Sequence, residues 1–99
     1  MQVLFYSKPV FELGQVVQTQ GIYNACEESE EFSEEIGNAF YKYTCGNWGD
    51  TCEEDKKLNN EAIEAGERIV AKYETSKGNV FIITEWDRSY TTILFADEY

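Results

Sequence analysis

The stretch IVAKYETSKGNVFIITEWDRSYTTILF, residues 69–95, decides the fold of this chain. Apolar and polar residues alternate over Ile69–Glu74, which is the pattern of a half-buried strand. The turn residues Thr75–Asn79 and the nearly continuous apolar run Val80–Glu85 follow, and together they predict a hairpin whose second strand is central. A further strand over Thr91–Phe95 completes an antiparallel meander of three strands.

Two shorter strands are predicted before this meander. Gln2–Tyr6 ends at Ser7–Pro9, because proline lacks a ladder donor and disfavours helix in the residue before it. Gly14–Thr19 contains the β-branched pair Val16 and Val17 between glycine and polar residues, which favours a strand. An N-terminal strand of this kind can add to the meander.

From Asn24 the period changes to that of a helix, and the pattern predicts one helix that stops near Thr44. Asn24 and Glu27 have the spacing of a capping box. Gly37 lies inside the pattern and costs about 1 kcal/mol relative to alanine, so a break is possible there. The residues of the expected buried stripe are Ala25, Phe32, Ile36, Ala39, Phe40 and Tyr43.

A second helix is predicted over Cys52–Ala65, with Asp50 or Thr51 as its cap and Glu53 or Glu54 at the reciprocal position. Gly66 supplies the left-handed residue that commonly closes a helix. The expected buried stripe of this helix consists of Leu58, Ala62 and Ala65.

These elements predict an α+β fold, with an antiparallel sheet of three to five strands and two helices packed on one face. The chain has 99 residues, of which 42% are hydrophobic, and this suits one domain over residues 1–99 with one core.

The net charge of -11 argues against direct binding to nucleic acid or to an anionic membrane, because both are polyanions. The chain contains no histidine, which removes the commonest general base at neutral pH and most zinc chemistry. Cys26, Cys45 and Cys52 lack metal-ligand spacing and are expected to be free thiols in a reducing compartment. We therefore expect no cofactor and no metal site. The first residues do not resemble a signal peptide, so we expect a cytoplasmic protein.

The acidic residues are concentrated on the two predicted helices. From Glu27 to Glu67 there are thirteen acids against Lys42, Lys56 and Lys57. Like charges at i and i+4 destabilise a helix, so folding alone does not call for such a run. Two interpretations stay open: a solvated face, or a surface that imitates the phosphates of nucleic acid and docks in a basic groove. The densest run holds Glu27, Glu28, Glu30, Glu31, Glu34 and Glu35.

Three other groups of residues have alternative interpretations. Asp50, Glu53, Glu54 and Asp55 are typical of a helix start, although carboxylates also bind hard cations. Trp48 either anchors the loop between the helices in the core or contacts a partner. The last group is a possible histidine-free catalytic site made of Asp50, Asp87 and Arg88.

The chain resembles small uncharacterised proteins of phages, plasmids and other mobile elements, some labelled plasmid-related proteins, which share the pattern GDWGD...ED...N...G.R...Y...ITEADRS.TT.L.P.EY. The stretches that align with this pattern are Asn47–Asp50, Glu54, Asp55, Asn59, Ala62, Gly66, Arg68, Tyr73, Ile83–Phe95, Glu98 and Tyr99. The resemblance covers residues 14–99. The chain departs from the pattern at Asn47, Trp86 and Ala96, where the family has Asp, Ala and Pro, and in the acidic run Glu27–Glu35.

The resemblance implies a mobile-element origin, and such elements carry inhibitors of host restriction and CRISPR systems, several of which block basic nucleic-acid channels. We therefore expect a non-enzymatic inhibitor in the bacterial cytoplasm that binds a basic groove of a host defence protein or ribonucleoprotein. The alternatives are the histidine-free enzyme and an adaptor that binds through exposed aromatic residues. The expected partner-binding residues are Glu27, Glu28, Glu30, Glu31, Glu34, Glu35, Trp48, Asp50, Glu53, Glu54 and Asp55.

Overall fold

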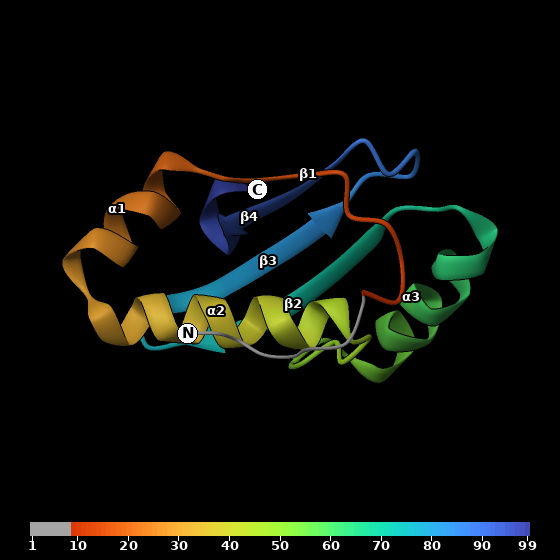
Figure 1. Cartoon of the computed structure of the whole chain (residues 1–99). Coiled ribbons are helices and arrows are strands. Elements are labelled where there is room, and N and C mark those ends of the chain that lie inside the picture. The colour runs from red at the N-terminus through yellow and green to blue at the C-terminus, as the bar shows by residue number, and fades with distance from the viewer. Residues whose placement is uncertain (1–8) are drawn as a thin grey trace.

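The computed structural model describes residues 9–99, which form an α+β fold of three α-helices and a four-stranded mixed sheet (Figure 1). The predicted strand Gln2–Tyr6 lies outside the described residues. Within those residues, no helix is both long and apolar enough to cross a membrane. The elements are β1 (Gln15–Gln18), α1 (Gln20–Glu28), α2 (Glu30–Thr44), α3 (Glu53–Ala65), β2 (Ile69–Thr75), β3 (Gly78–Thr84), β4 (Tyr90–Phe95) and the short 3-10 helix η1 (Ala96–Glu98).

The strands lie in the order β1-β4-β3-β2. The meander β2-β3-β4 is antiparallel, as predicted. The prediction of a purely antiparallel sheet is wrong, because β1 pairs in parallel with β4 from Gln15↔Tyr90 to Gln18↔Ile93. The helices return the chain to the end of the sheet at which β1 began, so β2 runs in the same direction as β1. Two hairpin reversals then give β4 that direction as well.

The single helix predicted from Asn24 to Thr44 is two helices joined at Ser29. Thr19 caps α1 and Ser29 caps α2; each side-chain oxygen accepts the backbone N–H three residues later, at 3.2 and 3.1 Å. Asn24 is therefore inside α1 and not a cap. Gly37 lies exposed in the middle of α2 and does not break it. A capping serine in extended conformation ends one helix and starts the next, which a single glycine does not do.

Helix α3 begins one residue later than predicted, with Cys52 as an N-cap that makes no side-chain hydrogen bond. Asp50 and Thr51 do not cap it, because their side chains bind the edge of the sheet instead. Gly66 closes α3 in the left-handed conformation with φ 72°, which confirms the prediction.

The buried face of α3 is turned relative to the predicted stripe. Leu58 is 55% exposed and Ala65 is exposed, whereas Ala62 is buried as predicted. The buried residue beside it is polar: the Asn59 amide donates to the Val70 carbonyl at 2.8 Å and accepts the Val70 N–H at 3.2 Å. The Asn59 side chain thus supplies hydrogen bonds to outward backbone groups of β2. A hydrophobic pattern does not predict that a polar residue is buried for this reason.

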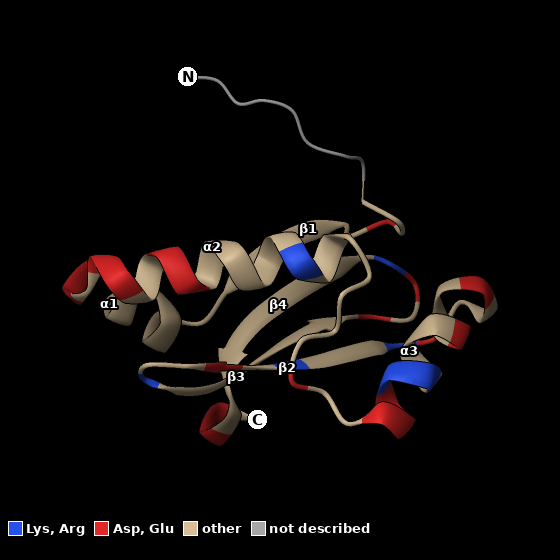
Figure 2. Cartoon of the chain, turned by 90° about the horizontal axis from the view of Figure 1, so that it is seen from below, with Lys and Arg blue, Asp and Glu red and all other residues tan. Residues whose placement is uncertain are grey.

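The hydrophobic core lies between α1, α2 and one face of the sheet. Figure 2 shows α2 on one side of the sheet and η1 on the other. The predicted stripe of the first helical region is confirmed, although Phe40 is only half-buried. The core residues on the sheet are Ile69, Ala71, Tyr73, Val80, Ile82 and Ile93.

A chain of buried hydroxyl groups crosses this core. Tyr43 Oη and Thr84 Oγ1 lie 2.7 Å apart, as do Thr84 Oγ1 and Thr91 Oγ1. Thr91 Oγ1 donates to the Leu13 carbonyl at 2.7 Å. Each hydroxyl has one proton, so Thr84 must donate to Thr91 and Tyr43 to Thr84. The chain thereby ties α2, β3, β4 and the segment before β1 together.

We expect the free energy of unfolding to fall as the pH rises above about 10, the ordinary pKa of tyrosine. Burial raises the pKa of both Tyr43 and Tyr73, so these phenols stay protonated in the folded protein while the unfolded chain ionises. The unfolded state then binds fewer protons, which removes stability that is fully present below pH 10. Urea unfolding between about pH 8 and 11 measures this effect. The substitution Tyr73→Phe should make the decline shallower; an unchanged slope would contradict the assignment.

Candidate partner-binding surface

The joint between α1 and α2 gathers the densest acidic run of the chain. We call the glutamates Glu27, Glu28, Glu30, Glu31 and Glu34 the elbow. Glu30 and Glu31 lie in the first turn of α2, where the helix dipole favours negative charge. Glu27 and Glu28 lie in the last turn of α1, which has no basic residue and whose dipole disfavours them. The arrangement therefore costs helix stability on one side of the joint.

Most elbow glutamates have no compensating base in the part of the chain that the structure describes. Glu27, Glu30, Glu31 and Glu34 are exposed, and among the ion pairs within residues 9–99 none involves them. Glu28 Oε1 lies 3.6 Å from Lys77 Nζ at the tip of the β2-β3 hairpin, and its side chain is still largely exposed. The elbow thus presents, on a capped helical joint, four carboxylates that form no ion pair with the described residues.

Glu35, which the sequence placed with the others, has a structural contact. Its carboxylate accepts the Ser76 hydroxyl at 2.7 Å and the Ser76 N–H at 3.1 Å. These bonds hold the β2-β3 turn against α2, and Glu35 is only half-exposed. Removing this side chain would perturb the hairpin, so Glu35 is unsuitable as a test of charge alone.

The acids of α3 do not join the elbow. Figure 2 shows the red residues of the α1-α2 joint and those of α3 at opposite ends of the molecule. Glu53, Glu54 and Asp55 are exposed, and Glu53 pairs with Lys56 at 3.2 Å. Within residues 9–99 no three acidic or cysteine side chains converge to hold a metal ion. The acidic residues predicted to bind a partner therefore divide into two separate groups, and the cation interpretation of the α3 start gains no support.

Trp48 is an anchor and not a surface contact. It is 3% exposed, and its Nε1 donates to Asn60 Oδ1 at 2.8 Å. Its ring packs against Tyr43 and Phe11, with centroids 5.6 and 6.0 Å away. The prediction that Trp48 contacts a partner is wrong, because the loop that carries it folds into the core.

The loop after Trp48 covers the outer edge of β2. Gly49 forms a parallel bridge with Lys72, and the Asp50 N–H donates to the Lys72 carbonyl at 2.9 Å. Thr51 Oγ1 accepts the Lys72 N–H at 2.7 Å, and Asp50 Oδ2 accepts the Glu74 N–H at 2.9 Å. Asp50 is therefore committed to holding this loop on the sheet.

Asp87 and Arg88 also have structural contacts. Hydrogen bonds from the Ser89 hydroxyl and N–H hold the pKa of the Asp87 carboxyl below its ordinary value. Arg88 has a positive φ of 59° and donates from Nη1 to the Glu67 carbonyl at 2.7 Å and from Nη2 to the Ala62 carbonyl at 2.9 Å. Its guanidinium satisfies carbonyls at the end of α3, where a cation is favoured.

The three residues of the possible catalytic site do not come together. Asp50 binds beside Glu74, near the end of β2, whereas Arg88 binds Glu67, before its start. A strand rises about 3.3 Å per residue, so these positions are about 20 Å apart. That separation is beyond any shared hydrogen-bond reach, and this arrangement gives no joint acid, base and anion clamp.

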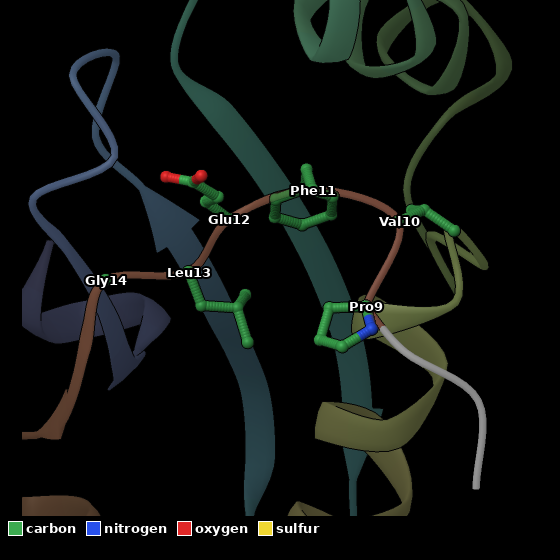
Figure 3. Close-up of a pocket in the computed structure, with 6 residues that line it drawn as sticks. All are labelled: Pro9, Val10, Phe11, Glu12, Leu13 and Gly14. Carbon is green, nitrogen blue, oxygen red and sulfur yellow. The ribbon is translucent and has the colours of Figure 1, made fainter.

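A shallow hollow of about 530 Å³ lies along the segment 9–14 (Figure 3). All six lining residues belong to that one segment, and Glu12 is the only charged one. The Glu12 and Leu13 side chains point to opposite sides of the segment, while Phe11 packs on Tyr43. The hollow therefore lacks the converging polar groups that fix a small ligand.

Exposed aromatic residues lie on separate elements: Tyr23 on α1, Tyr41 on α2 and Trp86 between β3 and β4. Trp86 is 66% exposed and Tyr90, four residues later, is 43% exposed. The sequence pattern did not single out these residues, because it does not distinguish an exposed aromatic at the end of a strand from one in the core. A comparison of the chain with family models, curated proteins and solved structures gives no match.

Proposed function

We propose that this chain is a non-enzymatic acidic binding protein whose elbow occupies a Lys/Arg-lined nucleic-acid site on a host defence protein or ribonucleoprotein. The observation that supports the proposal is that four carboxylates on one capped joint form no ion pair within residues 9–99. Within α2 successive residues rise about 1.5 Å each, so Glu34 lies about 5 Å along the helix axis from Glu30 and Glu31, a spacing comparable with that of the phosphates of a nucleic-acid strand. Such a surface competes with nucleic acid for a basic groove.

The structure of the joint supports a fixed display of charge. Ser29 is the only residue between two capped helices, and Phe32, directly after the first elbow residues of α2, is fully buried. The phenyl ring of Phe32 stacks on Phe95 with centroids 5.5 Å apart. A preorganised set of charges loses less conformational entropy on binding than a flexible acidic tail does.

The resemblance to mobile-element proteins supports the choice of a defence complex as partner, by association. The residues that carry the resemblance and those of the elbow are separate: Asp50 and Arg88 hold loops, and Thr84 and Thr91 hold the core. The elbow lies in the stretch where this chain departs from the shared pattern. We therefore assign the binding role to the elbow of this chain and the structural role to the shared residues. A cytoplasmic location in the bacterial host is part of this proposal.

The combined substitution E27K/E30K/E31K/E34K tests the charge mechanism. We expect it to leave the fold intact and to weaken binding at least about 100-fold, because it reverses the charge of these four carboxylates. The unaltered protein and the variant are each used to capture partners from a bacterial lysate freed of nucleic acid, at about 50 and 200 mM salt. Added duplex DNA or RNA should release the captured protein, since the nucleic acid and the elbow occupy the same groove.

The matched control is E54K/E61K/E64K/E67K, which makes the same charge change at the α3 end, where all four glutamates are exposed. This control should bind about as well as the unaltered protein. Equal losses from both variants would show that only net charge matters. Capture that resists both high salt and competing nucleic acid would contradict the proposal.

A further inference from the structure

The outer edge of β1 is the unpaired edge of the sheet in the described part of the chain. All four residues of β1, Gln15–Gln18, are exposed, and among residues 9–99 the only strand that pairs with them is β4 (Figure 1). The opposite edge, on β2, is covered by the loop 49–51 and by Asn59. Within the described residues, the β2 edge of the sheet is therefore hydrogen-bonded to other parts of the chain and the β1 edge is not.

Hydrogen bonds to β4 fix which backbone groups of β1 point outward. The N–H groups of Gln15 and Thr19 donate to the carbonyls of Ser89 and Ile93, both at 3.1 Å. Backbone groups alternate in direction along a strand, so residues 15, 17 and 19 face β4. The N–H and C=O of Val16 and Gln18 face away from the sheet. These four groups form a template for one further strand.

The residues of β1 lack the usual protection of a sheet edge. There is no Lys, no Pro and no charged side chain among Gln15, Val16, Val17 and Gln18, and Val16 and Val17 are 44% and 37% exposed. β-Branched side chains favour extended neighbours. The chain as a whole has a net charge of -11, but this short edge carries no charge. An extended segment can therefore pair with the outward backbone groups of β1 without meeting a charged side chain on the strand itself.

The charges at both ends of β1 indicate what kind of segment fits. At the first end, the Ser89 carbonyl accepts the N–H of Gln15, the first residue of β1. Asp87, two residues before Ser89, and Glu12, three residues before Gln15, are both exposed. At the other end, Glu98 accepts the Thr19 hydroxyl at 2.8 Å. Arg88, the residue before Ser89, donates to the Glu67 and Ala62 carbonyls at the end of α3. These acids attract a basic segment and repel a second copy of this acidic chain.

We propose that the outer edge of β1 binds an extended, Lys/Arg-containing segment of another protein as a fifth strand. Backbone hydrogen bonds to Val16 and Gln18 supply the docking, and the acids at the two ends select basic side chains. This site stands on the backbone of β1 and does not depend on the elbow.

The experiment uses the whole chain and a blocked peptide of alternating lysine and valine as the probe. We expect binding to slow amide hydrogen exchange at Val16 and Gln18 at least about tenfold, while the amides of Gln15 and Val17, already facing β4, change little. A peptide of alternating serine and valine should bind more weakly, and one of alternating glutamate and valine should not bind, because the end charges discriminate among them.

The substitution Val16→Pro removes an N–H that faces away from β4, so it spares the internal ladder. We expect it to weaken peptide binding about tenfold, since it removes one outward donor and places a ring on the edge. Val16→Thr keeps the N–H and a β-branched side chain and should bind as the unaltered protein does. Gln18→Pro serves as a second variant if Val16→Pro alters the fold, which exchange of the β4 amides reports.

Three outcomes would overturn the proposal. The first is the absence of protection at Val16 and Gln18 with the lysine-valine peptide. The second is self-association in sedimentation with protection at those two amides, which would assign the edge to a second copy. The third is binding that survives Val16→Pro and is lost in E27K/E30K/E31K/E34K, which would show charge attraction at the elbow alone. That last result leaves the proposed function standing, and loss of elbow-dependent capture leaves the strand site standing.

Discussion

Replacing Gly49 with alanine should lower the free energy of unfolding by about 3 kcal/mol, because a strained backbone conformation and a steric collision act at one residue. Gly49 has φ 64°, a region that L side chains rarely adopt. A Cβ at this position would collide with Cδ1 and Cε1 of the Tyr73 ring. The ring cannot move aside easily, since it is buried and its hydroxyl donates to the Asn47 carbonyl at 2.8 Å. Chemical denaturation of both proteins measures the difference.

Gly66 provides the matched control for this substitution. Its φ of 72° is similar, but a Cβ there would meet no atom within 4 Å. Gly66→Ala should therefore cost only about 1 kcal/mol, the cost of the left-handed conformation alone. If the two substitutions lowered the free energy of unfolding equally, the collision between the new Cβ and the Tyr73 ring would contribute nothing to the loss.

The second large effect is expected from Thr91→Val, which should cost about 3 kcal/mol. Valine has nearly the shape of threonine, so the loss arises from hydrogen bonds. The substitution leaves the Thr84 hydroxyl without its acceptor and the Leu13 carbonyl without its donor. Unsatisfied buried polar groups carry their full desolvation cost. Urea denaturation gives the free energy, and exchange of the Val10 amide, which bonds the Thr44 carbonyl at 2.9 Å, reports on the segment before β1.

Thr92 is the control on the same strand. It lies half-buried on the other face of the sheet and forms no side-chain hydrogen bond within residues 9–99, so Thr92→Val should change stability by less than about 0.5 kcal/mol. In the double variant T84V/T91V, the second substitution should cost less than it does alone, because both partners of one bond are then removed. Strict additivity of the two costs would argue against a connected chain of hydroxyl groups.

Local patterns predicted the elements whose signals are contained in a few residues. The β2-β3-β4 meander was predicted from the alternation after Ile69 and from the turn residues between the strands, and the structure confirms it. Gly66 was predicted as the end of α3, because a left-handed residue is required there whatever the rest of the fold. The joint at Ser29 was missed because the apolar stripe continues across it, from Ala25 to Phe32, and this continuity conceals a cap.

The candidate surface was only partly predictable. The run of glutamates at the elbow is visible in the sequence, and its members Glu27, Glu30, Glu31 and Glu34 are exposed in the structure. The different status of Glu35 was not visible, because its partner Ser76 is 41 residues away. The interpretation of Trp48 and the separation of Asp50 from Arg88 likewise depend on which parts of the chain meet.

The amino-acid sequence by itself determined the α+β class, the hairpins, the left-handed glycine and the concentration of acid on the helices, since each follows from neighbours a few positions apart. Only the tertiary structure decided that β1 runs parallel to β4, that the acids divide between two ends, and that residues 9–99 cover one edge of the sheet and leave the other open. The physical reason is that pairing of distant strands and burial of loops are set by the packing of the whole core, which no local pattern contains.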